Sequence, residues 1–191
     1  SLKEASLFQI NILGGNILMY PDFSELVDEL NGYSFRKIYK VNIKQLTDIQ
    51  QCCQILAHPS NRLEIICTDT NDLDKLTAVR GRLDLSLVQI NIPVQSDQDL
   101  SCIESFTQNN PDFTINMTPF YNGQNESFFQ ENVFVSEEEL AQVSFKSIKR
   151  NSILNHNFFG KFICLPNGDV YSNLNGNCLG NIKQDSFAAM A

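Results

Sequence analysis

The stretch LFQINILGGNILMYPDFSELVDEL, residues 7–30, contains the pattern of a complete βα unit. Residues 7–13 are rich in Leu, Ile and Phe, as in a strand, and Gly14 and Gly15 follow them. Glycines at a strand exit often allow the backbone to come close to another group. The segment after Pro21 has the i, i+3, i+4, i+7 spacing of an amphipathic helix, with apolar residues at Phe23, Leu26, Val27 and Leu30.

Strand patterns recur along the chain at intervals of 22 to 28 residues. They begin at Leu7, Phe35, Leu63, Leu85 and Phe113. Helix patterns lie between them, after Pro21, from Thr47, after Asn71 and after Ser96. A repeated βα unit predicts parallel strands joined by right-handed crossovers. We therefore expect the α/β class, with an incomplete parallel βα barrel of about five strands in residues 1–149.

The pattern changes after the fifth predicted strand. Residues 122–132, NGQNESFFQEN, are polar and predict an irregular loop. A helix with a capping box from Ser136 to Glu139 is expected to follow.

A small β module is predicted at the end of the chain, over residues 150–191. Residues 158–165 have the composition of a strand, Pro166–Asp169 predicts a tight turn, and Val170 begins the return strand. This part is expected to form a hairpin beside the barrel.

Composition excludes several classes of protein. The net charge of −8 and the pI near 4.7 argue against general binding to nucleic acid or to anionic membranes, which requires excess Lys and Arg. No apolar run is long enough to span a bilayer, and no signal peptide opens the sequence. The six cysteines show no CxxC spacing and are typical of reduced thiols, so a cytoplasmic protein is expected.

Ligands of parallel α/β sheets bind beyond the carboxyl ends of the strands. The predicted ends are polar and small, at residues 14–16, 42–44, 68–71, 93–96 and 119–122. The pair Gly14–Gly15 has two interpretations: a close approach to a ligand, or a strand exit with positive φ, which we favour for the backbone conformation. Thr68 and Asp69 either meet a ribose hydroxyl or, as we favour, cap the next helix.

Two further groups of side chains at these ends have alternative interpretations. Lys40 and Lys44 flank the second strand end and are either partners of a substrate carboxylate or, more commonly, solvated. Aromatic residues follow the fifth strand and form either a peptide-binding patch or, as we favour, a cover for the open barrel end. These are Phe120, Tyr121, Phe128 and Phe129.

Two motifs resemble the radical SAM enzymes that modify peptides. Residues 13–30, LGGNILMYPDFSELVDEL, resemble the second strand, loop and helix of that family, where the strand ends in Gly-Gly-Glu-Pro. Residues 163–182, ICLPNGDVYSNLNGNCLGNI, resemble the SPASM region that follows the barrel. The resemblance implies strands two to six of a radical-SAM-like partial barrel, followed by an incomplete SPASM-like hairpin.

The sequence also departs from that family. It has no CxxxCxxC, the motif whose three thiolates hold a [4Fe–4S] cluster in the family. Asn16 stands in place of the glutamate that contacts the amino group of SAM, and Ile17 in place of the proline. Ser172 and Asn173 stand where the hairpin has Pro-Cys, which leaves Cys164 and Cys178 as weak metal candidates.

The resemblance and the departures together imply a non-catalytic radical-SAM/SPASM-like protein, a pseudo-enzyme that binds a peptide or a radical SAM partner in ribosomal peptide maturation. No catalytic residue and no cofactor are expected in this chain. Gly14, Gly15, Asn16, Thr68 and Asp69 are then vestigial SAM-loop positions. The alternative is the C-terminal part of an active radical SAM oxidoreductase whose cluster-binding segment precedes residue 1, and SAM and a [4Fe–4S] cluster are expected only in that case. A third possibility is a generic α/β barrel.

Overall fold

A computed structural model describes residues 7–46, 49–134, 161–186 and 189 of the chain. It divides into two compact units, one of which comprises Leu7–Phe134, while the described residues after 160 belong to the other. The predicted division between residues 149 and 150 and the predicted helix at Ser136–Glu139 lie outside the described residues.

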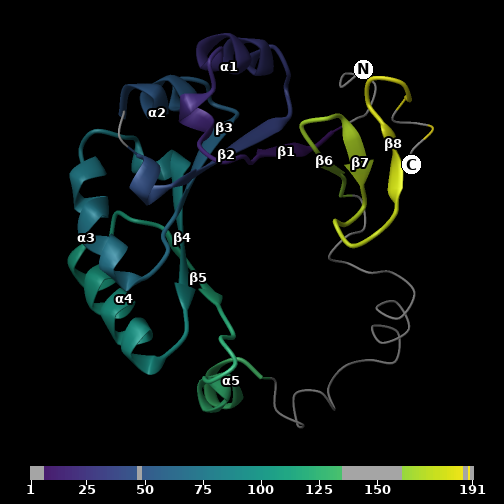
Figure 1. The fold of residues 1–191 in the computed structure, drawn as a ribbon. Helices are drawn as coiled ribbons and strands as arrows, with labels where there is room; N and C mark the ends of the chain where they lie inside the picture. Colours follow the sequence, from purple (N-terminus) through teal and green to yellow (C-terminus); the bar gives the residue numbers. More distant parts are fainter. Residues whose placement is uncertain (1–6, 47–48, 135–160, 187–188, 190–191) are drawn as a thin grey trace. The chain divides into compact units, whose positions relative to one another are not determined.

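The first unit is built on a five-stranded parallel sheet with the order β1-β2-β3-β4-β5 (Figure 1). The strands are β1 Gln9–Ile12, β2 Arg36–Asn42, β3 Asn61–Ile66, β4 Val88–Val94 and β5 Ile115–Pro119. Each strand pairs with the next one along the chain, as expected of repeated βα units. The predicted α/β class and the partial parallel βα barrel are confirmed.

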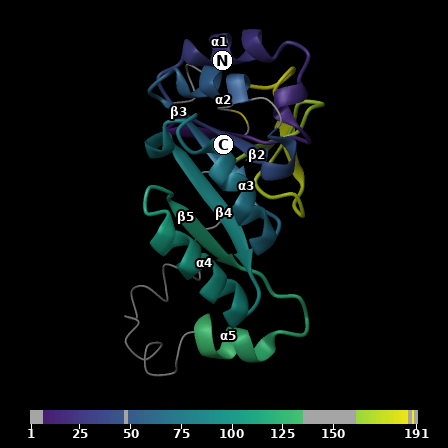
Figure 2. The same ribbon diagram turned by 90° about the vertical axis from the view of Figure 1, so that its left-hand side faces the viewer.

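Helices follow each strand. They are α1 Phe23–Asn31, α2 Ile49–Leu56, α3 Leu73–Leu76, α4 Asp97–Asn109 and α5 Glu126–Asn132. Helices α1 to α4 lie on one face of the sheet (Figures 1 and 2). The predicted start of the second helix at Thr47 lies outside the described residues.

The core lies between these helices and the sheet. Residues that alternate along β2, β3 and β4 are fully buried and face the helices, among them Tyr39, Leu63 and Ile90. Burial of one such side chain stabilises the fold by about 1.5–3 kcal/mol. Because side chains of a strand alternate between the two faces, the residues between them lie on the face opposite the helices.

The loop predicted for residues 122–132 is wrong, because Glu126–Asn132 form α5. The sequence is polar, but Phe128 and Phe129 are only 6% and 9% exposed and join the core of this unit. Short helices are stabilised mainly by tertiary packing of their apolar face, so composition alone did not reveal this one.

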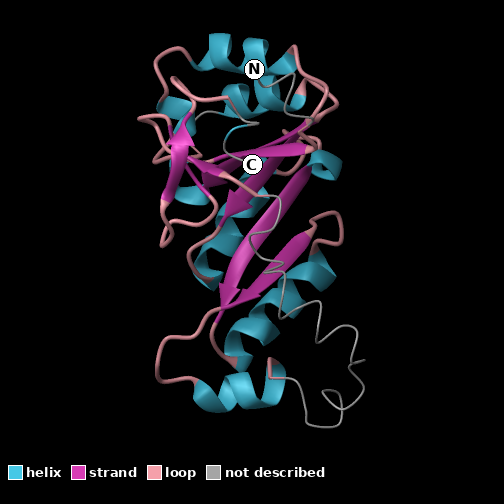
Figure 3. Cartoon of the chain, turned by 90° about the vertical axis from the view of Figure 1, so that its right-hand side faces the viewer, coloured by secondary structure: helices cyan, strands magenta, loops and turns pink. Residues whose placement is uncertain are grey.

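The second unit contains a three-stranded antiparallel sheet with the order β6-β7-β8 (Figure 3). The strands are β6 Ile163–Cys164, β7 Asp169–Tyr171 and β8 Cys178–Asn181. The predicted turn holds Gly168 at a φ of +98°, where an added Cβ would lie 2.8 Å from the Asn181 side chain. The hairpin is confirmed and β8 is an additional strand. Of the predicted strand 158–165, residues 158–160 lie outside the described residues, and Ile163–Cys164 form β6.

Because one face of the sheet is buried, we expect substitutions at neighbouring residues of β4 to have very different effects on the free energy of unfolding. We expect Ile90→Ala to lower the free energy of unfolding by about 2–5 kcal/mol, because it leaves a cavity at a fully buried position. The exposed neighbour Gln89 is the control, and Gln89→Ala should change stability by no more than about 0.5 kcal/mol. Urea unfolding followed by circular dichroism measures both, and equal effects would contradict this assignment of the two faces.

Candidate functional site

The carboxyl ends of β1 to β4 share one local design, in which a side-chain oxygen caps the helical turn that follows. The turns after β1, β2 and β3 are short 3₁₀ helices, and the segment after β4 is α4. The bonds are Asn16 Oδ1 to Leu18 N (3.2 Å), Asn42 Oδ1 to Lys44 N (2.9 Å), Asp69 Oδ1 to Asn71 N (2.9 Å) and Ser96 Oγ to Asp99 N (3.2 Å). These caps satisfy backbone N–H groups at the starts of the turns.

The glycine pair after β1 does not have the conformation that we favoured. Neither Gly14 nor Gly15 has a positive φ, so that prediction is wrong. A Cβ built at either glycine meets no atom of the described residues within 4 Å. Neither backbone strain nor crowding among these residues requires glycine there, and the approach of a ligand stays a prediction for both positions.

Thr68 and Asp69 follow β3 and have structural partners. The backbone N–H and the hydroxyl of Thr68 both donate to Asp72 Oδ2, each at 2.8 Å. Asp69 caps the 3₁₀ helix Thr70–Asp72, as the favoured interpretation predicted. Nothing in these contacts tests whether the two residues also meet a ligand.

Asp72, which follows β3 at the carboxyl end of the sheet, is buried, with an exposed fraction of 1%. Burial by itself raises its pKa, but hydrogen bonds from Lys75 Nζ (2.6 Å) and from Thr68 outweigh burial and lower the pKa to about 2. Asp72 is therefore ionised and holds the exit of β3 against the following helix.

Hydrogen bonds also join the exits of β3, β4 and β5. Asp99 Oδ2 accepts from Gln95 N and from Ser96 Oγ, both at 3.0 Å, and Asp99 Oδ1 lies 3.5 Å from Thr70 Oγ1. After β5, Asn122 Nδ2 donates to Gln95 Oε1 at 3.0 Å. The polar residues predicted at the ends of these three strands are thus joined by side-chain hydrogen bonds.

A second polar group lies on the face of the sheet opposite the helices. Lys40 Nζ of β2 lies 2.6 Å from Glu64 Oε1 of β3, and Asn91 of β4 donates its side-chain N–H to the same oxygen. The side chains of Lys40 and Glu64 are 24% and 9% exposed, so the ion pair is half-buried. Lys40 was a predicted candidate, whereas Glu64 and Asn91 were not. Their proximity depends on the strand register, in which Lys40 pairs with Glu64 and Ile66 pairs with Asn91.

One acceptor of this group has no partner among the described residues. Asn91 Oδ1 is buried and accepts no hydrogen bond within the described part of the chain. A buried acceptor without a donor costs about 1–3 kcal/mol. The ion pair and the amide of Asn91 therefore tie β2, β3 and β4 together on this face of the sheet at some cost in stability.

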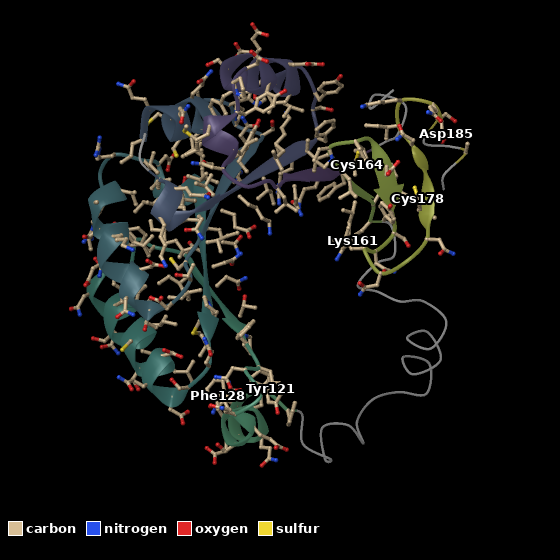
Figure 4. All side chains as sticks on the ribbon, viewed as in Figure 1. Tyr121, Phe128, Lys161, Cys164, Cys178 and Asp185 are labelled. Carbon is tan, nitrogen blue, oxygen red and sulfur yellow. The ribbon has the colours of Figure 1, made fainter. Side chains whose placement is uncertain are left out.

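The aromatic residues after β5 fall into two sets. Phe128 and Phe129 are buried, and Phe129 contacts Tyr121 and Phe134 edge to face, with ring centroids 5.4 Å and 5.8 Å apart. Phe120, Tyr121 and Phe134 are 53–59% exposed. Figure 4 labels Tyr121 and Phe128 at this end of the unit. The first set covers the core, and the second leaves an apolar surface.

The two metal candidates of the hairpin lie on different strands. Cys164 pairs with Val170 and Cys178 with Tyr171, and both thiols are exposed (Figure 4). The register between β7 and β8 shifts between Val170 and Tyr171, next to the pair that contains Cys178. Within the described ranges no three His, Cys, Asp or Glu side chains form a group that could hold a metal ion.

Comparison with known proteins supports the fold and leaves the family open. No family model matches the chain, and no curated protein matches its sequence. Among solved structures, SuiB of Streptococcus suis, a radical SAM/SPASM-type peptide-modifying enzyme, is similar with a TM-score of 0.62 and 11% identity. The match covers 94% of this chain and 54% of SuiB, so the chain spans about half the length of that enzyme. The chain therefore has a fold similar to that of the matched part of SuiB.

Membrane insertion has no support in the helices. None of those in the described ranges combines the length and the apolar composition that crossing a bilayer requires.

We expect the difference in stability between the wild type and a variant without the Asp72 carboxyl to depend on pH. Because its folded pKa lies below the ordinary value of 3.8, it stabilises the fold above that pH, and the effect is lost as the pH falls through about 2. We expect Asp72→Asn to lower the free energy of unfolding by about 2 kcal/mol near pH 7 and by progressively less toward pH 2.

Urea unfolding over a pH series measures this difference. Asp69→Asn is the matched control, because asparagine caps a helical turn as well as aspartate does, and it should be nearly neutral. A difference between wild type and Asp72→Asn that does not change with pH would contradict the assignment.

Proposed function

We propose that the chain is a catalytically silent protein of radical-SAM/SPASM-like fold that binds an extended peptide in the maturation of ribosomal peptides. The observation that carries this proposal is the side chain of Asn16. In the family that the loop resembles, the third position after the glycines is a glutamate that contacts the ammonium of SAM. Asn16 carries no charge, and its oxygen accepts from Leu18 N.

The surface that suits an extended peptide is the outer edge of β5. Among the described residues this strand pairs with β4 alone, and all of its residues but the first are exposed. Ile90 N donates to Thr114 O, and Phe120 N donates to Val94 O, both at 2.9 Å. Since backbone groups alternate in direction along a strand, the N–H and C=O of Met117 point away from β4 and are available to a further strand.

The exposed aromatic set lies directly after that edge in the sequence. Phe120 and Tyr121 follow β5 by one and two residues and are 54% and 53% exposed. A peptide strand added to β5 gains backbone hydrogen bonds from the edge and apolar contacts from these rings, the combination by which strand addition achieves affinity and specificity. Within the described residues β8 of the hairpin unit pairs with β7 alone, so its other edge offers a second place for the same mode of binding.

The alternative function is that of an active radical SAM oxidoreductase of which this chain is the C-terminal part. The similarity to SuiB favours it, because the chain corresponds to about half of that enzyme. In that case Gly14, Gly15 and Asn16 line the SAM site, and the thiolates of the cluster come from residues outside this sequence.

Iron and sulfide analysis distinguishes the two functions. We expect the full-length protein, purified without oxygen, to contain neither iron nor sulfide and to give no heat on titration with SAM. The family's cluster supplies four irons and four sulfides, so about four of each per chain, together with SAM binding, would establish the alternative.

Peptide binding is tested at Met117. Titration calorimetry with a precursor peptide encoded beside the gene should show binding, and Met117→Pro should weaken it at least about fivefold by removing one outward N–H. Met117→Ala is the control, because it shortens the same side chain but keeps the N–H. Proline is tolerated at strand edges, so Met117→Pro should fold. Equal affinities of the two variants, or no heat with any such peptide, would refute strand addition at β5.

A further inference from the structure

A cavity of about 360 Å³ lies at the amino-terminal ends of β2 and β3, the sheet edge opposite the strand exits described above. All of its described lining residues belong to the first unit, and none is Asp or Glu. The side chains that decide its chemistry are Phe8, Ser34, Phe35, Arg36, Ser60 and Arg62.

Two arginines give this cavity its charge. The Arg36 guanidinium lies over the ring of Phe8, with Cζ 5.9 Å from the ring centroid, and the backbone N–H of Arg36 donates to the backbone oxygen of Phe8 at 3.1 Å. Arg62 donates through Nη1 to the backbone oxygens of Pro59 (2.8 Å) and Asn61 (2.6 Å). Neither guanidinium forms an ion pair within the described ranges. The Phe8 ring and the backbone oxygens of Pro59 and Asn61 hold the two guanidiniums in place, and Asp84 interacts electrostatically with Arg62 without forming an ion pair.

A third cation lies behind the wall of the cavity. Lys37 is fully buried, its Nζ donates to Ser60 Oγ at 2.8 Å, and it lies 5.4 Å from the centroid of the Phe35 ring. His58 Nδ1 is also 2.8 Å from Ser60 Oγ. These contacts fix the wall formed by Ser60 and Phe35.

A second cavity of about 200 Å³ shares Arg36 and Arg62 with the first. It extends over the sheet face opposite the helices and is lined there by Glu64 and Gln89. The carboxylate of Glu64 is already bound by Lys40 at 2.6 Å, so it does not neutralise the arginines. The two guanidiniums therefore line two adjoining cavities.

We propose that these residues form a binding site for a small organic anion, whose carboxylate or phosphate group contacts Arg36 and Arg62 and whose apolar body packs on Phe8 and Phe35. Guanidinium groups bind such oxyanions through paired, charge-assisted hydrogen bonds. The volume lies within the range of small-molecule sites. The chain carries a net charge of −8, so this attraction for anions is a local property of the site. The proposal is independent of peptide binding at β5.

Three probes of similar size test the site by titration calorimetry: phenyl phosphate, benzoate and benzyl alcohol. We expect one phenyl phosphate or one benzoate to bind per chain, and benzyl alcohol, which lacks the charge, not to bind. The ratio of the two anion affinities shows which headgroup the arginines prefer. Binding of the anions should also weaken with added salt. Equal binding of all three probes, or no binding of either anion, would overturn the proposal.

Arg36→Gln locates the site. It should weaken anion binding about tenfold or more, since one charge-assisted hydrogen-bonding partner is lost. The control is Arg80→Gln, which removes the same charge from an arginine paired with Asp112 at 2.9 Å and absent from the lining of either cavity. Thermal unfolding confirms that both variants fold. Unchanged affinity in Arg36→Gln, or the same loss in Arg80→Gln, would refute the assignment.

Discussion

The alternation of side chains along three adjacent parallel strands is the constraint on which the rest of the structure depends. In β2, β3 and β4 it directs Tyr39, Leu63 and Ile90 to the helices, where they are fully buried. The same alternation directs Lys40 and Glu64 to the opposite face. A register shift of one residue would bury the ion pair among apolar side chains, at a cost of several kcal/mol per ion. Burial and charge therefore specify a single register.

The fold was predictable because its signals are local and repeated. Apolar runs at regular intervals, the helix pattern after Pro21 and the Pro166–Asp169 turn each predict an element that the structure contains. The helix α5 was missed because Phe128 and Phe129 are buried in the core by tertiary packing, which a polar local composition does not reveal. Strand β8 was missed for a related reason: it is short and pairs with β7 across an intervening loop.

The candidate site was only partly predictable. The edge that carries Asn16 and Asp69 follows from the rule on parallel sheets, and their capping bonds follow from residue type. The partners Glu64 and Asn91 of Lys40 could not be found, because pairing across strands depends on register, which the sequence does not state. The conformation of Gly14–Gly15 was mispredicted because glycine permits a positive φ without requiring one.

The chemistry of the outer edge of β5 differs from that at the starts of β2 and β3. Along β5 the outward backbone groups of Met117 both donate and accept hydrogen bonds, as an added peptide strand requires. A carboxylate or a phosphate is bound better by an opposite charge. That complement for an anion lies at the strand starts, in Arg36 and Arg62. A peptide strand added along β5 and an anion at the strand starts would therefore occupy separate parts of one sheet without competing.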